Sequence, residues 1–262
     1  MRLLTRVLFH GGRVSTAAAA ALYSCAEATL TFADMRANIR TRWQRFNDRE
    51  FDVDQGLLEW EFDVTDRLAT PGASVLIAGC GSGRELFVYL ARGCRVTGID
   101  PAPQALGLAR TLLDKRGLAA ELIDGFIDDV EVPGRFDVVL FGWYCYSQIP
   151  EAARRIRTLQ RVVTMLNPGG RICLNYDQMP RPNPLVISAA RIAGALAGSD
   201  WRLEPGDVVD WRWRDGQPYF NFTHAFVPEE IERETAAAGL RIVHRRDPPD
   251  DPVYILEPDA RS

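Results

Sequence analysis

The sequence predicts an α/β protein with a doubly wound sheet of seven mostly parallel strands. From residue 74 onward, short apolar runs rich in Val, Ile and Leu alternate with segments of helical spacing. Buried strands separated by helices are typical of a parallel sheet that helices cover on both faces. Two late apolar runs are expected to complete the sheet with an antiparallel edge.

The expected elements follow one another in a regular order. The seven strands are predicted at 74–78, 95–99, 121–123, 136–141, 171–175, 240–243 and 253–256. Helices are predicted at 85–92, 104–116, 151–166 and 228–239. Pro103 can start the second helix and Gly117 can end it, while Asn167-Pro168-Gly169-Gly170 predicts a turn before the fifth strand.

Two segments stand outside this alternation and are predicted to form helical lid elements. Residues 1–70 form the first, and an insertion at about 178–222 forms the second, within a ligand-binding domain at 71–262. The insertion combines a helix at 185–196 with an aromatic-rich stretch at 201–222. These aromatic side chains either line a pocket for a small apolar or aromatic molecule or form the lid's own core.

Composition narrows the class of partner. The chain has 262 residues, a net charge of −4 and a pI near 5.5, so it carries no electrostatic footprint for nucleic acid and a small molecule is the expected partner. No run approaches the roughly 20 apolar residues of a membrane helix. Five cysteines without a C-x-x-C pair favour a reducing compartment, the cytoplasm. No metal site is expected, because the acidic residues 48–54 place their glycine, Gly56, outside the calcium-loop position.

The stretch IAGCGSGRE suggests a ligand-binding loop. Gly79, Gly81 and Gly83 occupy every second position between a strand and a helix, whose N-terminus favours an anionic group. The dinucleotide fingerprint needs glycine at 84, where this chain has Arg84. Asp100 ends the second strand, and a carboxylate there can accept both hydroxyls of a ribose. The ligand is therefore predicted to be a nucleoside, whose anionic part is a phosphate or an amino-acid carboxylate.

Five motifs in order resemble the class I S-adenosylmethionine-dependent methyltransferases. The glycine loop matches the first motif of that family and Asp100 with Pro101 its ribose-binding acid. Phe136-Asp137-Val138-Val139 resembles its fourth strand, and Leu166–Gly170 the turn before its fifth. The segment from His224 to Leu240 resembles its last helix and strand. The resemblance implies a Rossmann-like methyltransferase fold and S-adenosyl-L-methionine as the cofactor.

The resemblance also implies which residues contact the cofactor. They are Gly79, Cys80, Gly81, Ser82, Gly83, Asp100, Pro101, Gly125, Phe126, Ile127, Gly142 and Trp143. Two positions depart from the family. Ile77 stands where an acid commonly helps to hold the methionyl amine, which leaves more of that task to the carbonyls of Gly79 and Gly142. Phe126 replaces an aspartate that binds the adenine amino group, and either Asp124 or Asp128 is the substitute acceptor.

The acceptor of the methyl group is expected beyond the fourth strand. Trp143 and Tyr146 either contact substrate there or pack in the core. His224, Tyr144 and Tyr146 are the candidate catalytic residues, needed as a base only for hydroxyl or amine acceptors. Two other functions stay open: a non-catalytic cofactor-binding regulatory protein, and an NAD-dependent oxidoreductase, which Arg84 disfavours. The sequence leaves the oligomeric state open.

Overall fold

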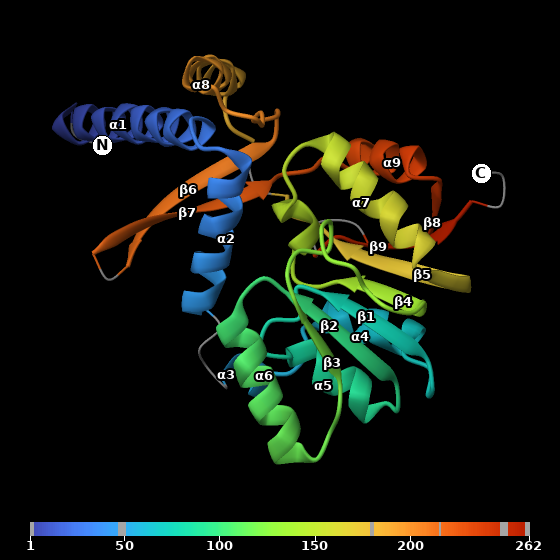
Figure 1. Ribbon diagram of the computed structural model, residues 1–262. Helices are drawn as coiled ribbons and strands as arrows, with labels where there is room; N and C mark the ends of the chain where they lie inside the picture. Colours follow the sequence, from blue (N-terminus) through green and yellow to red (C-terminus); the bar gives the residue numbers. More distant parts are fainter. Residues whose placement is uncertain (1–2, 47–50, 179–180, 215, 247–250, 260–262) are drawn as a thin grey trace. The chain divides into compact units, whose positions relative to one another are not determined.

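The computed structural model describes residues 3–46, 51–178, 181–214, 216–246 and 251–259 and divides the chain into two compact units (Figure 1). The sheet unit comprises residues 40–178 and 226–262, and the insertion unit comprises residues 1–39 and 179–225. The sequence had assigned residues 1–70 to the N-terminal lid segment. In the structure, the part of that segment from residue 40 belongs to the sheet unit.

The sheet unit contains the predicted seven-stranded sheet, in the order β3-β2-β1-β4-β5-β9-β8. The strands are β1 (Ser74–Ala78), β2 (Arg95–Asp100), β3 (Glu121–Asp124), β4 (Phe136–Phe141), β5 (Leu166–Asn175), β8 (Leu240–Arg246) and β9 (Val253–Pro258). The first five pair in parallel. The two late strands form the expected antiparallel edge: β9 lies between β5 and the outermost strand β8 and pairs antiparallel with both.

The helices of this unit surround the sheet. They are α3 (Phe51–Asp54), α4 (Glu59–Leu68), α5 (Arg84–Ala91), α6 (Pro103–Arg116), the short 3₁₀ helix η1 (Cys145–Gln148), α7 (Ala152–Thr164) and α9 (Pro228–Ala237). As predicted, Pro103 occupies the first turn of α6 and Gly117 ends it with φ +63°. The turn expected at Asn167–Gly170 lies inside β5, where the pairing with β4 shifts register between Phe136 and Val138.

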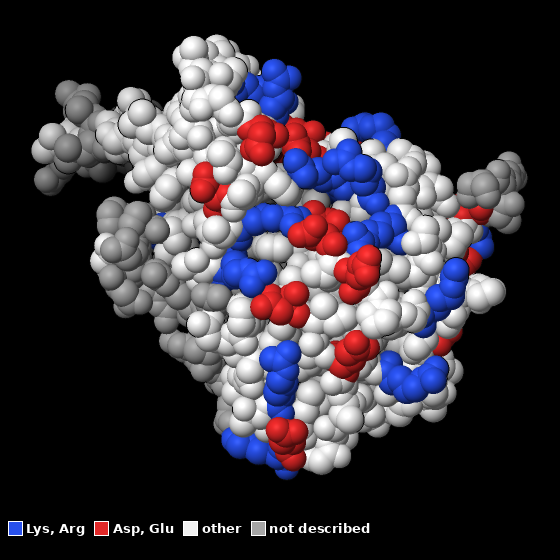
Figure 2. Space-filling view, viewed as in Figure 1, with Lys and Arg blue, Asp and Glu red and all other residues white. Residues whose placement is uncertain are grey.

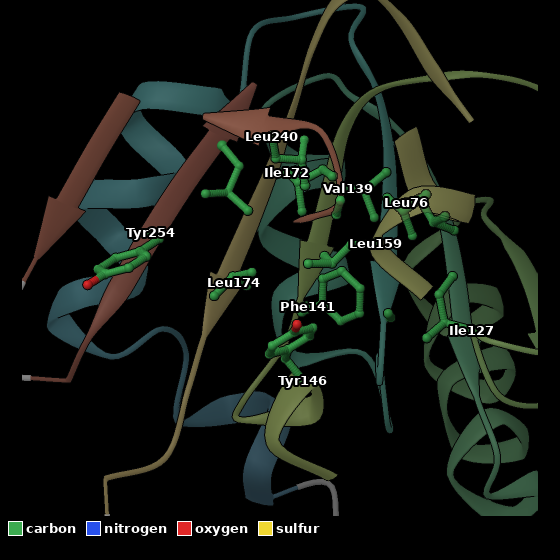
Figure 3. Packing of buried hydrophobic residues seen from close by; sticks show 14 of the residues in the cluster. Leu76, Ile127, Val139, Phe141, Tyr146, Leu159, Ile172, Leu174, Leu240 and Tyr254 are labelled. Atoms are coloured by element: carbon green, nitrogen blue, oxygen red, sulfur yellow. The ribbon is translucent and has the colours of Figure 1, made fainter. Parts of the chain in front are cut away.

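Two apolar cores cover the two faces of the sheet, because successive strand residues point to opposite sides. Leu76, Val139 and Phe141 face one core, which Leu159 of α7 and Tyr146 complete (Figure 3). Figure 3 also shows that this core reaches Ile172 and Leu174 on β5 and Tyr254 on β9. Ile77 and Leu140 face the other core, together with Trp60 and Val64 from α4 and Tyr89 from α5.

The insertion unit packs two helices and a β-hairpin. Helix α1 (Leu3–Ala28) contacts α8 (Pro184–Ala197) and strand β6 (Asp207–Arg214), and β6 pairs antiparallel with β7 (Gln217–His224). Helix α2 (Phe32–Phe46) starts in this unit and ends in the sheet unit. The sequence prediction did not include this hairpin, although Asp215-Gly216 between two runs of β-forming residues is a strong hairpin signal.

The aromatic residues of the insertion pack against one another. The ring centroids of Trp201 and Phe222, both buried, lie 6.0 Å apart in an edge-to-face contact. Trp211 lies 5.4 Å from Phe220 and 5.9 Å from Tyr23 of α1, measured between ring centroids. These contacts give the insertion unit an aromatic core of its own.

Candidate functional site

The glycine loop adopts a backbone that requires glycine. Gly79, Gly81 and Gly83 have φ values of +76°, +52° and +103°, in the region that side chains disfavour. A Cβ on Gly79 would lie 2.0 Å from the Sγ of Cys145. The N–H groups of Gly79 and Cys80 both donate to the carbonyl of Ile99, which ties the loop to β2. The loop therefore exposes backbone at the carboxyl end of β1, directly before α5.

Asp100 connects this loop to the end of β2. One carboxylate oxygen accepts from the N–H of Gly81 and the other from the N–H of Ala102, both at 2.8 Å. The side chain is buried, and this burial raises the pKa of Asp100 to about 6. Each carboxylate oxygen can accept a second hydrogen bond. The carboxyl group can therefore hold a diol while it keeps both backbone contacts.

The neighbouring strand β3 ends in a shallow apolar surface. Gly125 has φ +147° and leads into half-buried Phe126 and buried Ile127. The Arg40 guanidinium lies 6.0 Å from the Phe126 ring centroid and 2.9 Å from the Asp124 carboxylate. An apolar ring face beside Asp100, the acid that can hold a diol, suits a flat base such as that of a nucleoside.

Strand β4 ends at Gly142 beside the glycine loop, and its N–H donates to the carbonyl of Ala78. Trp143 follows with 42% of its surface exposed, and the guanidinium of Arg84 lies 5.9 Å from its ring centroid. Tyr144 adopts φ +59°, donates its N–H to Asn175 and its hydroxyl to Asp251. The predicted residues of β1, β2, β3 and β4 thus share the carboxyl edge of one sheet, where open α/β sheets bind ligands.

Comparisons with known proteins agree with this geometry. Residues 75–170, which contain the glycine loop, Asp100 and Gly142, match the family described as methyltransferase domain. The part of the chain that carries the glycine loop is therefore similar to a methyltransferase domain. Over 156 residues it is 30% identical to a ubiquinone biosynthesis O-methyltransferase of Xanthomonas campestris pv. campestris. That match covers 56% of this chain and 64% of the relative, so the chain spans slightly less than two thirds of it.

Solved structures share the fold of this methyltransferase domain at low sequence identity. The PH0226 protein of Pyrococcus horikoshii superimposes with a TM-score of 0.61 at 16% identity, covering 82% of this chain and 99% of that chain. CalS10, an amino pentose methyltransferase of Micromonospora echinaspora whose structure contains S-adenosylmethionine, gives a TM-score of 0.54 at 19% identity. That alignment covers 76% of this chain and 89% of that chain.

The three expected catalytic residues occupy different environments. Tyr146 is fully buried, and its hydroxyl donates to Glu234, which also forms an ion pair with buried Arg155 at 2.7 Å. His224 belongs to the insertion unit, where its buried ring lies 2.6 Å from the Asp207 carboxylate. Tyr144 is half-buried and is the member of the three that follows directly on Gly142 and Trp143, at the carboxyl edge of the sheet.

Sequence reasoning missed a charged group beneath the glycine loop. Arg84 extends one guanidinium nitrogen to within 2.5 Å of Glu61 on α4 and 2.7 Å of Glu85, and all three side chains are nearly buried. Glu61 also accepts the N–H of Leu58, the residue before α4, but with leucine at that position the sequence shows no capping box. The ion pair itself joins residues 23 positions apart, and only the fold brings them together.

The described surface and interior contain few other features of a binding site. On the face in Figure 2, acidic and basic side chains alternate and no broad basic patch forms among the described residues. In the same part of the chain, no cluster of His, Cys, Asp or Glu could hold a metal, and no helix has the length and apolar character to cross a membrane. Asp48 and Glu50 of the acidic segment lie outside the described residues.

Proposed function

We propose that this protein is an S-adenosylmethionine-dependent methyltransferase that moves a methyl group to a small-molecule acceptor by direct in-line displacement. Asp100 carries the proposal, since its buried carboxylate joins the glycine loop to the end of β2 and keeps lone pairs for a ribose. The matched methyltransferase domain of residues 75–170 contains this arrangement in full.

The residues at the sheet edge fit the parts of the cofactor. Asp100 would hold the ribose hydroxyls, Phe126 and Ile127 would flank the base, and the loop from Gly79 to Gly83 would lie along the amino-acid part. When bound, S-adenosylmethionine supplies a methyl group already activated on a sulfonium. The exposed ring of Trp143 can favour a positive charge through its face. The main task of the protein is to hold the acceptor in line and to exclude water.

Among the candidate catalytic residues, we assign Tyr144 a role in positioning the acceptor. Burial raises the pKa of Tyr144, as does the nearby Asp251, so the phenol stays protonated at neutral pH. Its hydroxyl proton is donated to Asp251, so its oxygen can accept a hydrogen bond from the acceptor molecule, but it is a poor base. Tyr146 and His224 are held by Glu234 and Asp207 inside their respective cores, and we propose that both are structural.

The class of acceptor rests on the relatives. The ubiquinone biosynthesis enzyme and the amino pentose enzyme are both named for small molecules. We place the protein in the cytoplasm, because none of its five cysteines forms a disulfide.

Two measurements test the proposal. Incubation with methyl-labelled S-adenosylmethionine and fractionated cell extract should put the label into the small-molecule fraction, as read by mass spectrometry. Label in protein or nucleic acid would refute the acceptor class, and tight cofactor binding without any labelled product would favour a regulatory protein. Calorimetry should show tighter binding of S-adenosylhomocysteine than of NAD, and the reverse order would favour an oxidoreductase.

A further inference from the structure

A small cavity with two carboxyl side chains in its lining lies on the face of the sheet that α4 and α5 cover. Trp60, Glu61, Glu85, Tyr89 and Gly142 contribute to its lining. Its free space is close to the minimum that one water molecule needs. An ammonium group has about the size of a water molecule, so the cavity matches such a group and excludes a larger one.

The carboxyl groups in the lining outnumber the positive charges beside them. Glu61 and Glu85 share the single guanidinium of Arg84, which leaves two carboxyl groups against one positive charge. Glu61 has 4% and Glu85 5% of its surface exposed, so solvent does little to compensate the difference. A buried group of this kind is stabilised by a proton or by a second cation.

The buried hydroxyl of Tyr89 adds one more oxygen to the lining, and this oxygen can accept a hydrogen bond from an ammonium group. The indole N–H of Trp60 is also buried and makes no hydrogen bond with the described residues. Because it is a donor, it cannot bond to an ammonium group, so the carboxyl groups and the Tyr89 oxygen are the acceptors of this lining.

Gly142, which follows β4 at the carboxyl edge of the sheet, is part of the lining. A Cβ on this glycine would lie 3.4 Å from the carbonyl oxygen of Gly79, and 3.5 Å from both the carbonyl oxygen of Ala78 and Oε1 of Glu85. Three oxygen acceptors therefore converge on the space beside the Gly142 Cα, and no side chain fills it. Three acceptors in one small space match the three N–H donors of an ammonium group.

We propose that Glu85, supported by Glu61 and Arg84, binds the α-ammonium group of the amino-acid part of S-adenosylmethionine beside Gly142. The inference rests on the proposed function, because it takes the cofactor as the source of the ammonium. It assigns the carboxylate for this group to helix α5, whereas position 77 of β1 holds an isoleucine that packs in the core.

Electrostatics around Glu85 support this assignment. Burial is the main cause that raises the pKa of Glu85, to about 7, and Glu61 raises it further while Arg84 lowers it. Tyr89 on α5, Cys80 in the loop and Cys145 in η1 also face this charge. Burial raises the pKa of all three further above their ordinary values, so they stay neutral at pH 7. Glu85 is thus about half protonated at pH 7 in the free protein and would release its proton when an ammonium binds.

The test compares S-adenosylhomocysteine with its desamino counterpart, in which hydrogen replaces the α-amino group. Calorimetry of the wild-type protein should show at least about 10-fold tighter binding of the amino compound. Glu85→Gln should remove most of this preference, because it weakens the binding of the amino compound and leaves the affinity for the desamino compound unchanged. Glu59→Gln on α4, whose side chain is 93% exposed, is the control and should leave both affinities unchanged.

A second readout needs only the wild-type protein, in case Glu85→Gln fails to fold. Titrations at pH 7 in buffers of different ionisation enthalpy should show release of about half a proton with the amino compound and almost none with the desamino compound. Equal affinities or equal proton release for the two compounds in the wild-type protein would overturn this inference alone. If the wild-type protein bound neither compound, the proposed function would fail with it.

Discussion

Replacement of Asp100 by asparagine tests how the glycine loop holds a ribose. The substitution keeps the volume of the side chain but replaces one acceptor oxygen by an amide donor. Either the N–H of Gly81 or that of Ala102 then faces this donor, since each now donates to one carboxylate oxygen at 2.8 Å. Such a loss of a buried acceptor costs about 1–3 kcal/mol of unfolding free energy.

The same substitution relieves the cost of a buried charge. Raising the pKa of Asp100 from 3.8 to about 6 corresponds to about 3 kcal/mol. The folded protein holds this proton more tightly than the unfolded chain. The stabilisation is therefore fully present below about pH 4 and is lost as the pH rises through about 6. At pH 7.5 the gain and the loss nearly cancel, so the unfolding free energy of Asp100→Asn should stay within about 2 kcal/mol of wild type.

Cofactor binding should respond much more strongly than stability. A hydrogen bond to a charged group contributes about 1.5–3 kcal/mol. Asp100→Asn should therefore weaken the binding of S-adenosylhomocysteine by about 10- to 100-fold, as measured by calorimetry at pH 7.5. In the wild-type protein the Kd should rise as the pH falls below about 6.

Asp137→Asn is the matched control for Asp100→Asn. Asp137 also accepts a backbone N–H, from Ser74, but it stands at the start of β4 and away from the carboxyl edge. The Asp137→Asn substitution should lower the melting temperature without changing the Kd for S-adenosylhomocysteine. An unchanged Kd in Asp100→Asn would refute the ribose assignment.

Three further changes test the loop and the two residues we regard as structural. Gly79→Ala should lower the unfolding free energy by about 2–4 kcal/mol and abolish cofactor binding, because its Cβ meets Cys145. The control Gly72→Ala, where φ is +86° but the space is open, should lower the unfolding free energy by only about 1 kcal/mol in denaturant unfolding. Tyr146→Phe should lower the unfolding free energy by about 1–2 kcal/mol, because it removes the hydrogen bond to Glu234. In the methyl-transfer assay kcat should stay within about threefold of wild type, and a fall of about 100-fold in kcat would show that Tyr146 is catalytic. His224→Asn should lower the unfolding free energy by about 2–4 kcal/mol, because it removes the partner of the buried Asp207 carboxylate. Below the melting temperature, kcat/KM should stay within about fivefold of wild type. A large fall in kcat with normal stability would contradict the structural role of His224.

The sequence predicted the sheet well because its signals are local. The runs at 74–78 and 136–141 coincide with β1 and β4, and Pro103 and Gly117 bound α6 as expected. The strand order near the C-terminus depends on non-local pairing, so the position of β9 between β5 and β8 could not follow from the chain order. Asp215-Gly216 could have predicted the hairpin β6–β7, but its aromatic residues were interpreted as part of a lid, either as the lining of a pocket or as the lid's own core.

The residues of the candidate site also fall into those with a local sequence signal and those that only the fold brings together. The glycine spacing and Asp100 are adjacent to strand ends, so their meeting at one edge of the sheet followed from the fold class. Glu61 and Glu85 come from two helices, and each fits the solvated face of a helix when the sequence is considered alone. Only tertiary packing buries them around Arg84 and beneath Gly142. The burial of His224 against Asp207 is equally a property of the folded insertion unit.

A crystal structure of the complex with S-adenosylhomocysteine would show directly whether Asp100 holds the ribose. We predict ribose hydroxyls within hydrogen-bond distance of the Asp100 carboxylate, with Gly81 and Ala102 still donating to it. We also predict the α-ammonium beside Gly142, between the carbonyl of Gly79 and the carboxylate of Glu85. A nucleoside bound away from the glycine loop, or a ribose that makes no contact with Asp100, would contradict the ribose assignment.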